Sequence, residues 1–210
     1  MALLHSPALN KGLSPTSEST QISSFLEIAI LAELYSYWLH FYREKGYVAR
    51  ADIDPIDIPN LLPHIELIDV IDERTFRYRL IGTHLNRVFG DDFTGDHLDA
   101  VKSGPYMEFL RSLYGDCARD GAPLFNRALF GHVKSEDLIV NRLLLPLRDT
   151  ADGPVTMLLF SNTFDLYERR VQTWYGTNVA LAGPFEQHDI GSITVLQQKT
   201  LTELNGHAAS

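Results

Sequence analysis

The sequence predicts an α+β domain: a five-stranded antiparallel sheet with helices on one face, preceded by an N-terminal helix. Early in the chain, apolar residues recur at helical spacing over about twenty residues. After them come two strand-like segments, several short helical segments and three more strand-like segments. That order is typical of an antiparallel sheet with helices packed against it. A length of 210 residues with 45% hydrophobic residues allows one such domain with a sizeable core.

Composition and pattern divide the chain into four parts. Residues 1–20 are rich in Ser, Thr, Pro and Gly and are expected to form a flexible leader. The N-terminal helix is expected within residues 21–48 and the sheet domain within residues 49–163. Residues 164–210 form a C-terminal extension, in which residues 169–182 show a helical pattern and residues 192–196 a strand pattern.

The N-terminal helix is predicted over residues 22–44, with Ser23 or Ser24 as its cap and Gly46 at its end. It is apolar on more than one side. A helix on a single surface buries one stripe, so the second side is predicted to pair with the same helix of another chain. Cover by the C-terminal extension is the alternative. The predicted homodimer interface consists of Ile30, Leu34, Trp38 and Phe41.

The sheet begins with a hairpin of residues 65–71 and 75–81. A short helix at residues 85–89 is expected to end at Gly90, and a longer helix over residues 105–120 at Gly121. The last three strands are predicted at residues 124–130, 138–147 and 155–163. Asp152-Gly153 supplies the turn between the final two.

Several short motifs, in this order and spacing, resemble a proteobacterial family of PAS-like proteins. The resemblance covers roughly residues 35–163. It implies a PAS fold with a sensory or scaffolding role, and it supplies no set of catalytic residues. The motifs are Tyr37-Trp38, Ala49-Arg50-Ala51-Asp52-Ile53-Asp54-Pro55, Leu61-Leu62-Pro63-His64-Ile65, Tyr78-Arg79-Leu80-Ile81-Gly82-Thr83, Phe89-Gly90, Thr94-Gly95 and Leu145-Pro146-Leu147.

We therefore expect a stand-alone, non-catalytic signalling module that binds a small ligand, a protein partner, or both. Arg127, Asn141 and Arg142 lie in otherwise apolar strands. Either they mark a polar outer face of the sheet, or one of them orients an acidic or carbonyl-bearing ligand in a cavity. Strand phase gives the predicted cavity lining as Tyr78, Phe109, Leu113, Phe125, Arg127, Asn141 and Leu143.

The sequence argues against several other classes of protein. A net charge of −9 disfavours a nucleic-acid partner. The most apolar stretch carries Glu27 and Glu33, which disfavours membrane insertion. The single cysteine, Cys117, allows no internal disulfide and no cysteine zinc site. We expect a cytoplasmic protein without metal or cofactor, although an unidentified small ligand remains possible.

Three further observations argue against a metal or cofactor site. Asp52, Asp54 and Asp57 are interrupted by Pro55, so capping is a better account of them than cation binding. The histidines are scattered, without a paired zinc motif. The flavin-binding motif of blue-light PAS photoreceptors is absent. The helix over residues 105–120 also lacks the histidine expected by resemblance to haem-binding PAS oxygen sensors.

Two alternatives to a signalling module stay open. One is a small cone-shaped α+β enzyme similar to ketosteroid isomerases, in which a cavity carboxylate transfers protons. Asp69 is the strand residue best suited to that role, since it is in phase with Leu67 and Ile71. The other is a structural dimer that binds no ligand.

Overall fold

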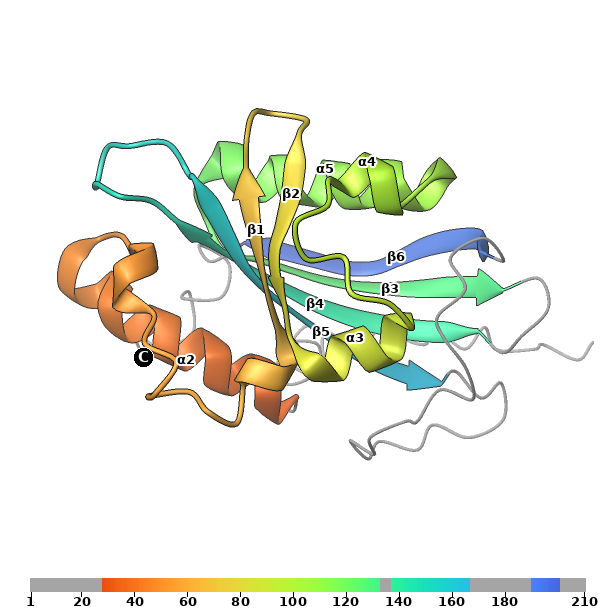
Figure 1. The fold of residues 1–210 in the computed structure, drawn as a ribbon, viewed down its shortest axis with the longest axis horizontal. Helices are drawn as coiled ribbons and strands as arrows, with labels where there is room; N and C mark the ends of the chain where they lie inside the picture. The colour runs from red at the N-terminus through yellow and green to blue at the C-terminus, as the bar shows by residue number, and fades with distance from the viewer. Residues whose placement is uncertain (1–27, 133–136, 167–189, 201–210) are drawn as a thin grey trace, which may run out of the picture.

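The computed structural model describes residues 28–132, 137–166 and 190–200. The predicted leader, the Ser23 or Ser24 cap and the helical pattern at residues 169–182 lie outside these residues. The described chain forms one antiparallel sheet in the order β2-β1-β5-β4-β3-β6 (Figure 1). Its strands are β1 Ile65–Val70, β2 Phe76–Ile81, β3 Leu124–His132, β4 Leu138–Leu147, β5 Met157–Leu166 and β6 Ile190–Thr200.

The sheet has six strands, one more than predicted. The sixth, β6, lies antiparallel to β3 and contains the strand pattern at residues 192–196. An edge strand carries a row of N–H and C=O groups without strand partners, and β6 supplies those partners along β3. The C-terminal extension therefore contributes directly to the sheet.

The helices predicted at residues 85–89 and 105–120 and the end of the N-terminal helix lie close to the predicted residues. The predicted helix start at residue 22 lies outside the described residues, and the short helix Leu98–Val101 was not predicted. Gly46 and Gly121 follow α2 and α5 in the left-handed conformation, with φ of 76° and 60°, which glycine adopts without a Cβ clash. The helices are α2 Ala29–Lys45, α3 Thr83–Phe89, α4 Leu98–Val101 and α5 Gly104–Asp120, with 3-10 turns η1 Arg50–Asp52 and η2 Leu62–His64.

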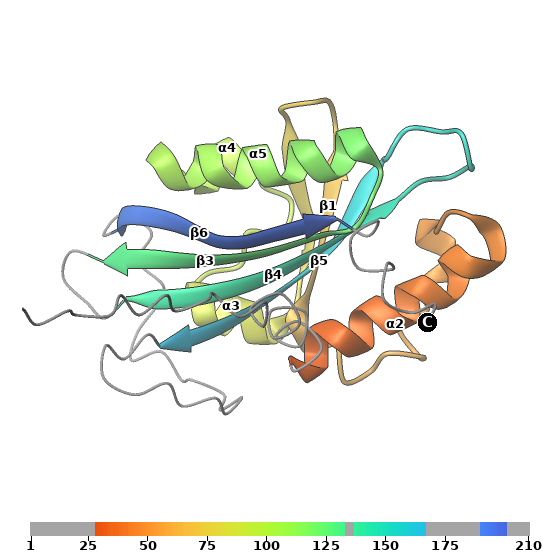
Figure 2. The same ribbon diagram turned by 180° about the vertical axis from the view of Figure 1, so that it is seen from behind.

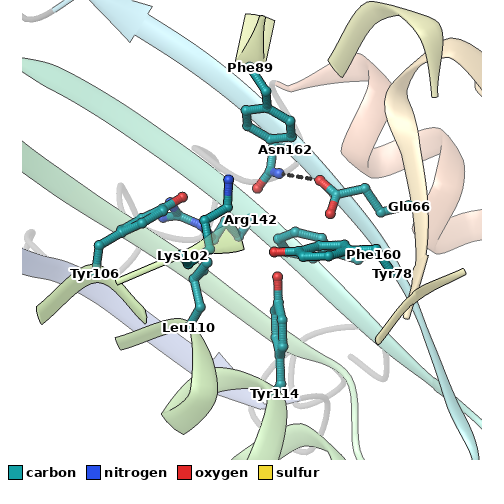
Figure 3. A pocket seen from close by; sticks show the side chains of 10 residues that line it. All are labelled: Glu66, Tyr78, Phe89, Lys102, Tyr106, Leu110, Tyr114, Arg142, Phe160 and Asn162. Carbon is teal, nitrogen blue, oxygen red and sulfur yellow. Dashed lines mark hydrogen bonds between the residues drawn. The ribbon is translucent and has the colours of Figure 1, made fainter. Parts of the chain in front are cut away.

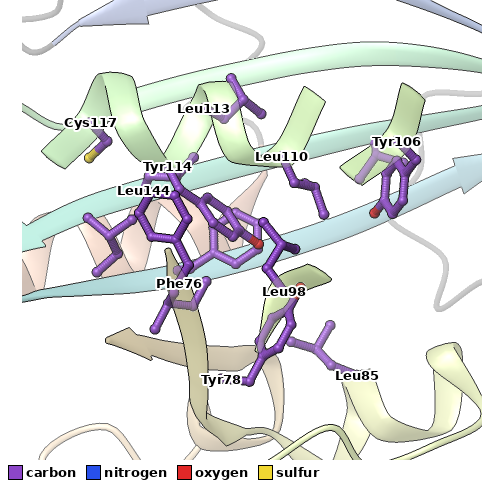
Figure 4. Close-up of a cluster of buried hydrophobic side chains, with 14 of the residues drawn as sticks. Phe76, Tyr78, Leu85, Leu98, Tyr106, Leu110, Leu113, Tyr114, Cys117 and Leu144 are labelled. Carbon is purple, nitrogen blue, oxygen red and sulfur yellow. The ribbon is translucent and has the colours of Figure 1, made fainter. Parts of the chain in front are cut away.

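Helices cover both faces of the sheet rather than one. α4 and α5 lie on one side and α2 on the other (Figures 1 and 2). We call the side under α3, α4 and α5 the inner face, and the side under α2 the outer face. Every residue of β4 is buried, as expected for a central strand covered on both sides. Figure 4 shows part of the inner-face cluster, to which Phe76, Leu110 and Leu144 belong.

The outer face is closed by α2 and the segment at residues 47–64. Leu31, Leu34, Tyr35 and Trp38 are buried there, and the outer-face cluster also includes Leu143, Leu145 and Leu147 of β4. Trp38 Nε1 donates a hydrogen bond to the carbonyl oxygen of Pro146 at 3.2 Å. This contact fixes the rotation of α2 on the sheet.

The predicted dimer interface is corrected by this packing. Leu34 and Trp38 are 0% and 1% exposed within one chain, so they offer no contact surface to a second copy. Ile30 and Phe41 are half-buried and pack against the same outer-face cluster. The prediction assumed one apolar sheet face, whereas the outer face is apolar too and takes the second side of the helix.

An irregularity in the β1–β2 pair sets which residues point inward. Leu67 pairs with Leu80 but Ile68 pairs with Tyr78, so Arg79 is an extra residue in β2. Both Tyr78 and Ile81 consequently join the inner-face cluster, although they are three residues apart. The same register brings Glu66 of β1 opposite Ile81.

Candidate functional site

A small pocket lies between the inner face and its helical cover (Figure 3). Its free volume is about 10 Å³, which is on the order of the room that one water molecule needs. Strands β1, β2, β4 and β5 form its floor, and α3, the C-cap of α4 and α5 form its cover. Its lining consists of Glu66, Tyr78, Phe89, Lys102, Tyr106, Leu110, Tyr114, Arg142, Phe160 and Asn162.

Three ionisable side chains share this pocket. Glu66, Lys102 and Arg142 are 1%, 5% and 1% exposed. None of the ion pairs among the described residues joins any two of them. A buried charge is costly unless it is paired. The burial of these three groups is therefore costly, and ion pairs among them do not offset that cost.

Glu66 enters the pocket from β1. Its Oε1 accepts a hydrogen bond from Asn162 Nδ2 at 2.9 Å, from the neighbouring strand β5. Burial raises the pKa of Glu66 to about 8, although Lys102, Arg142 and the Asn162 hydrogen bond all act to lower it. The protonated carboxyl group is therefore the main form at neutral pH.

Lys102 enters from the C-cap position of α4. Its Nζ lies 4.9 Å and 4.1 Å from the ring centres of Phe89 and Phe93, within the range of cation–π attraction. Burial lowers the pKa of Lys102 to about 8, and the nearby Glu66 partly opposes that change. The ammonium form persists at neutral pH close to both aromatic rings.

Arg142 enters from the centre of β4. Its guanidinium carbon lies 5.4 Å and 4.8 Å from the ring centres of Phe109 and Phe130, and its side chain is hydrogen-bonded to Tyr106. Nε and Nη1 have no hydrogen-bond acceptor among the described residues. A buried N–H group without an acceptor costs about 1–3 kcal/mol. A further hydrogen-bond acceptor beside this arginine would therefore stabilise the site.

Neutral polar groups complete the wall. The hydroxyl groups of Tyr78 and Tyr114 are hydrogen-bonded to each other, and burial raises both pKa values well above the usual range. They stay protonated at physiological pH. The amide oxygen of Asn162 is buried without a hydrogen-bond donor among the described residues. The site therefore offers both donors and acceptors around a very small space.

Residues 27–159, more than half of the chain, match a family described as PAS domain. The chain belongs to the PAS domain family. Neither the curated proteins nor the solved structures that were compared with it include a significant match. The PAS-like fold predicted from the sequence is thereby confirmed, and the match includes the N-terminal helix.

The PAS pocket contains part of the predicted lining. Tyr78 lines it directly. Leu113 and Phe109 lie in α5 and belong to or pack against the inner-face cluster, and Phe109 also contacts the Arg142 guanidinium. These three predictions placed the residues on the correct side of the sheet.

Four predicted lining residues point to the opposite side of the PAS sheet. Phe125 and Leu143 belong to the outer-face cluster, and Arg127 and Asn141 share their strand phase. Asn141 Nδ2 donates to Thr163 Oγ1 at 3.3 Å. A shift of one residue exchanges the two faces of a strand, which is the error made here. Of the three polar strand residues considered, Arg142 is the one that faces the pocket.

The carboxylate of the enzyme alternative was also misplaced. Asp69 is in phase with Leu67 on the outer face, where its carboxylate pairs with Arg77 at 2.6 Å and Arg79 at 3.4 Å. The pocket carboxylate is Glu66, three residues earlier in β1. A glutamate inside the apolar run at residues 65–68 was the available signal. Lys102 gave no comparable signal, because only tertiary packing brings it to the pocket.

Other candidates prove to be local structure. Asp52 Oδ2 accepts a hydrogen bond from the amide of Ala49 and Asp54 Oδ1 from that of Ile56, both at 2.9 Å, as the capping interpretation expects. Cys117 is buried, and burial raises the pKa of its thiol.

Two histidines that are distant in the sequence lie together. The rings of His64 and His84 are 4.4 Å apart, a contact that the sequence did not reveal. Across the described residues, no three potential metal ligands cluster. The same part of the chain contains no helix that is both long and apolar enough to cross a membrane.

Proposed function

We propose that this PAS domain is a sensory module that binds a small ligand in the pocket of Glu66, Lys102 and Arg142. The observation that carries the proposal is Arg142, a fully buried guanidinium with two nitrogens that lack an acceptor. A concave site with a few convergent polar groups and shifted pKa values is the usual form of a ligand site. In this proposal the module has no catalytic activity of its own.

Association with another protein is the proposed output. A second copy of the chain, bound through exposed parts of the N-terminal helix, is one proposed partner, and a signalling protein is the other. Leu34 and Trp38 are excluded from that contact by their burial. A cytoplasmic location is also proposed, because the chain has a single cysteine and therefore no internal disulfide.

The enzyme alternative gains one observation, which is the raised pKa of Glu66 in the pocket. Such a carboxyl group can act as a general acid. The free volume, however, is on the order of one water molecule, which leaves no room for a ring-sized substrate beside it. Ligand binding without conversion is therefore favoured.

Native mass spectrometry of freshly purified protein tests the proposal. We expect a bound small molecule on the wild-type chain and on an Arg74→Gln control, whose side chain is 74% exposed. The Arg142→Gln variant should lose it. If the wild-type chain carries no molecule and a metabolite library does not stabilise it against heat, the ligand-free structural module is correct. The same spectra report the oligomeric state.

A further inference from the structure

We propose that the ligand of this pocket is a small carboxylate anion, held by the guanidinium of Arg142 and the ammonium group of Lys102. The inference rests on the proposed function and specifies its ligand. Its basis is the charge, the hydrogen-bonding capacity and the size of the site in Figure 3.

The charge of the site favours an anion. Two cationic side chains and one carboxyl group surround one space, and none of them is joined to another by an ion pair. Even with Glu66 ionised, the three groups sum to one positive charge. With Glu66 protonated, as its raised pKa favours at neutral pH, they sum to two. A cationic ligand would be repelled, and a neutral ligand would leave the excess charge buried and uncompensated.

The hydrogen-bonding capacity favours an acceptor-only group. Arg142 Nε and Nη1 are donors without acceptors among the described residues, and the Lys102 ammonium group, which has three N–H donors, lies over the rings of Phe89 and Phe93. A carboxylate carries two oxygens and accepts several hydrogen bonds without offering a donor. Charge-assisted hydrogen bonds of this kind are about twice as strong as neutral ones.

The size of the site favours a carboxylate over a phosphate. A free volume of about 10 Å³ is on the order of one water. A planar head of three heavy atoms suits this space better than a tetrahedral group of five. Formate, with three heavy atoms, is therefore the carboxylate nearest to this size, and acetate requires side chains of the lining to move apart.

Glu66 couples the binding to protons. The polar groups that share the pocket with it are Lys102, Arg142, Asn162 and the hydroxyl groups of Tyr78, Tyr106 and Tyr114. Below about pH 8 Glu66 is protonated and Lys102 charged, so the acid form of Glu66 can donate its O–H to the anion. Above that pH Glu66 becomes negative and Lys102 neutral. Both changes disfavour an anion, so the affinity should fall as the pH rises.

Calorimetric titration and thermal denaturation with sodium formate and sodium acetate test the inference. The neutral isostere acetamide, sodium chloride at equal ionic strength and sodium phosphate are the comparison probes. At about pH 6.5 we expect formate and acetate to bind and to raise the melting temperature. At about pH 9.5 their affinity should be at least about tenfold lower. Acetamide should have no effect.

Arg142→Gln should weaken acetate binding by about thirtyfold or more, since one partner of a buried charge pair is removed. Arg74→Gln should leave it unchanged. If Arg142→Gln does not fold, Lys102→Gln supplies the same comparison, with circular dichroism of each variant as the check of folding.

The outcomes separate the inference from the proposed function. If acetamide binds as well as acetate, or if phosphate or chloride binds better, the carboxylate assignment is wrong while ligand binding stands. If no probe binds but native mass spectrometry shows a bound molecule, the assignment also falls alone. If neither experiment finds a ligand, both proposals are wrong.

Discussion

Glu66 is a single carboxyl group whose protonation the fold changes. Its pKa is raised from 4.5 to about 8 by burial, so between these values the folded chain holds a proton that the unfolded chain releases. The contribution of this group to the free energy of unfolding is therefore highest below about pH 4.5 and falls as the pH rises toward 8. One titrating group changes it by at most about 1.4 kcal/mol per pH unit.

We predict that Glu66→Gln removes this fall. Urea denaturation of the wild-type chain and the variant from about pH 5 to pH 8 measures the difference. The wild-type midpoint should decrease relative to that of the variant across this interval. Lys102 does not disturb the comparison, because its lowered pKa affects stability only above about pH 8, where it acts in the opposite direction. Parallel pH profiles for the two proteins would contradict the prediction.

Gly82 is a residue whose missing side chain permits a close backbone contact. A Cβ at this position would lie 2.4 Å from the carbonyl oxygen of Pro63, while the Gly82 amide donates to Ile65 O at 2.8 Å. We predict that Gly82→Ala destabilises the fold by about 1–3 kcal/mol or more, because neither backbone segment can yield easily. Gly115→Ala, in α5, is the matched control. A Cβ at Gly115 would lie 3.3 Å from the carbonyl oxygen of Glu73. Equal urea midpoints for the two variants would show that the contact at Gly82 does not constrain the fold.

At the scale of elements, α2 behaves as part of the core. Leu34 is fully buried on the outer face, whereas Ser36, two residues on, is exposed. We predict that Leu34→Ala lowers the free energy of unfolding by about 2–5 kcal/mol and that Ser36→Ala changes it by about 0.5 kcal/mol or less. Chemical denaturation measures both. A Leu34 variant as stable as the Ser36 variant would mean that α2 is only loosely attached to the sheet.

The existence of most elements followed from local patterns, although α4 was not predicted, and the direction of their side chains did not follow. Leu138–Leu147 was predicted to the residue because a continuous apolar run marks a buried strand. The same run has no alternation, so it could not show that Arg142 rather than Asn141 faces the pocket. The extra residue at Arg79 likewise changes the phase within β2 without a local sequence signal. Lys102 reaches the pocket through the packing of α4 on the sheet, which no periodicity encodes.

At the scale of the whole molecule, the sheet is a central layer that needs both of its covers. The inner cover is made by residues 83–120 and carries the pocket, while the outer cover is made by residues 28–64 and seals the other face. The two clusters meet in the same strands, since alternate residues of β4 belong to each. Loss of the outer cover should therefore also disturb the floor of the pocket.

We predict that a chain beginning at Arg50 does not fold cooperatively. It lacks α2 and so exposes Leu143, Leu145 and Leu147 of β4, which are fully buried in the intact chain. Exposed apolar patches of this kind promote association. A chain beginning at Ile28 keeps every described residue and should unfold in one sharp transition. Sedimentation and urea denaturation of both, beside the full-length chain, make the comparison. A soluble, cooperatively unfolding monomer from the chain beginning at Arg50 would show that α2 is dispensable for the fold. If the full-length chain were then a dimer, α2 would be the contact between its subunits.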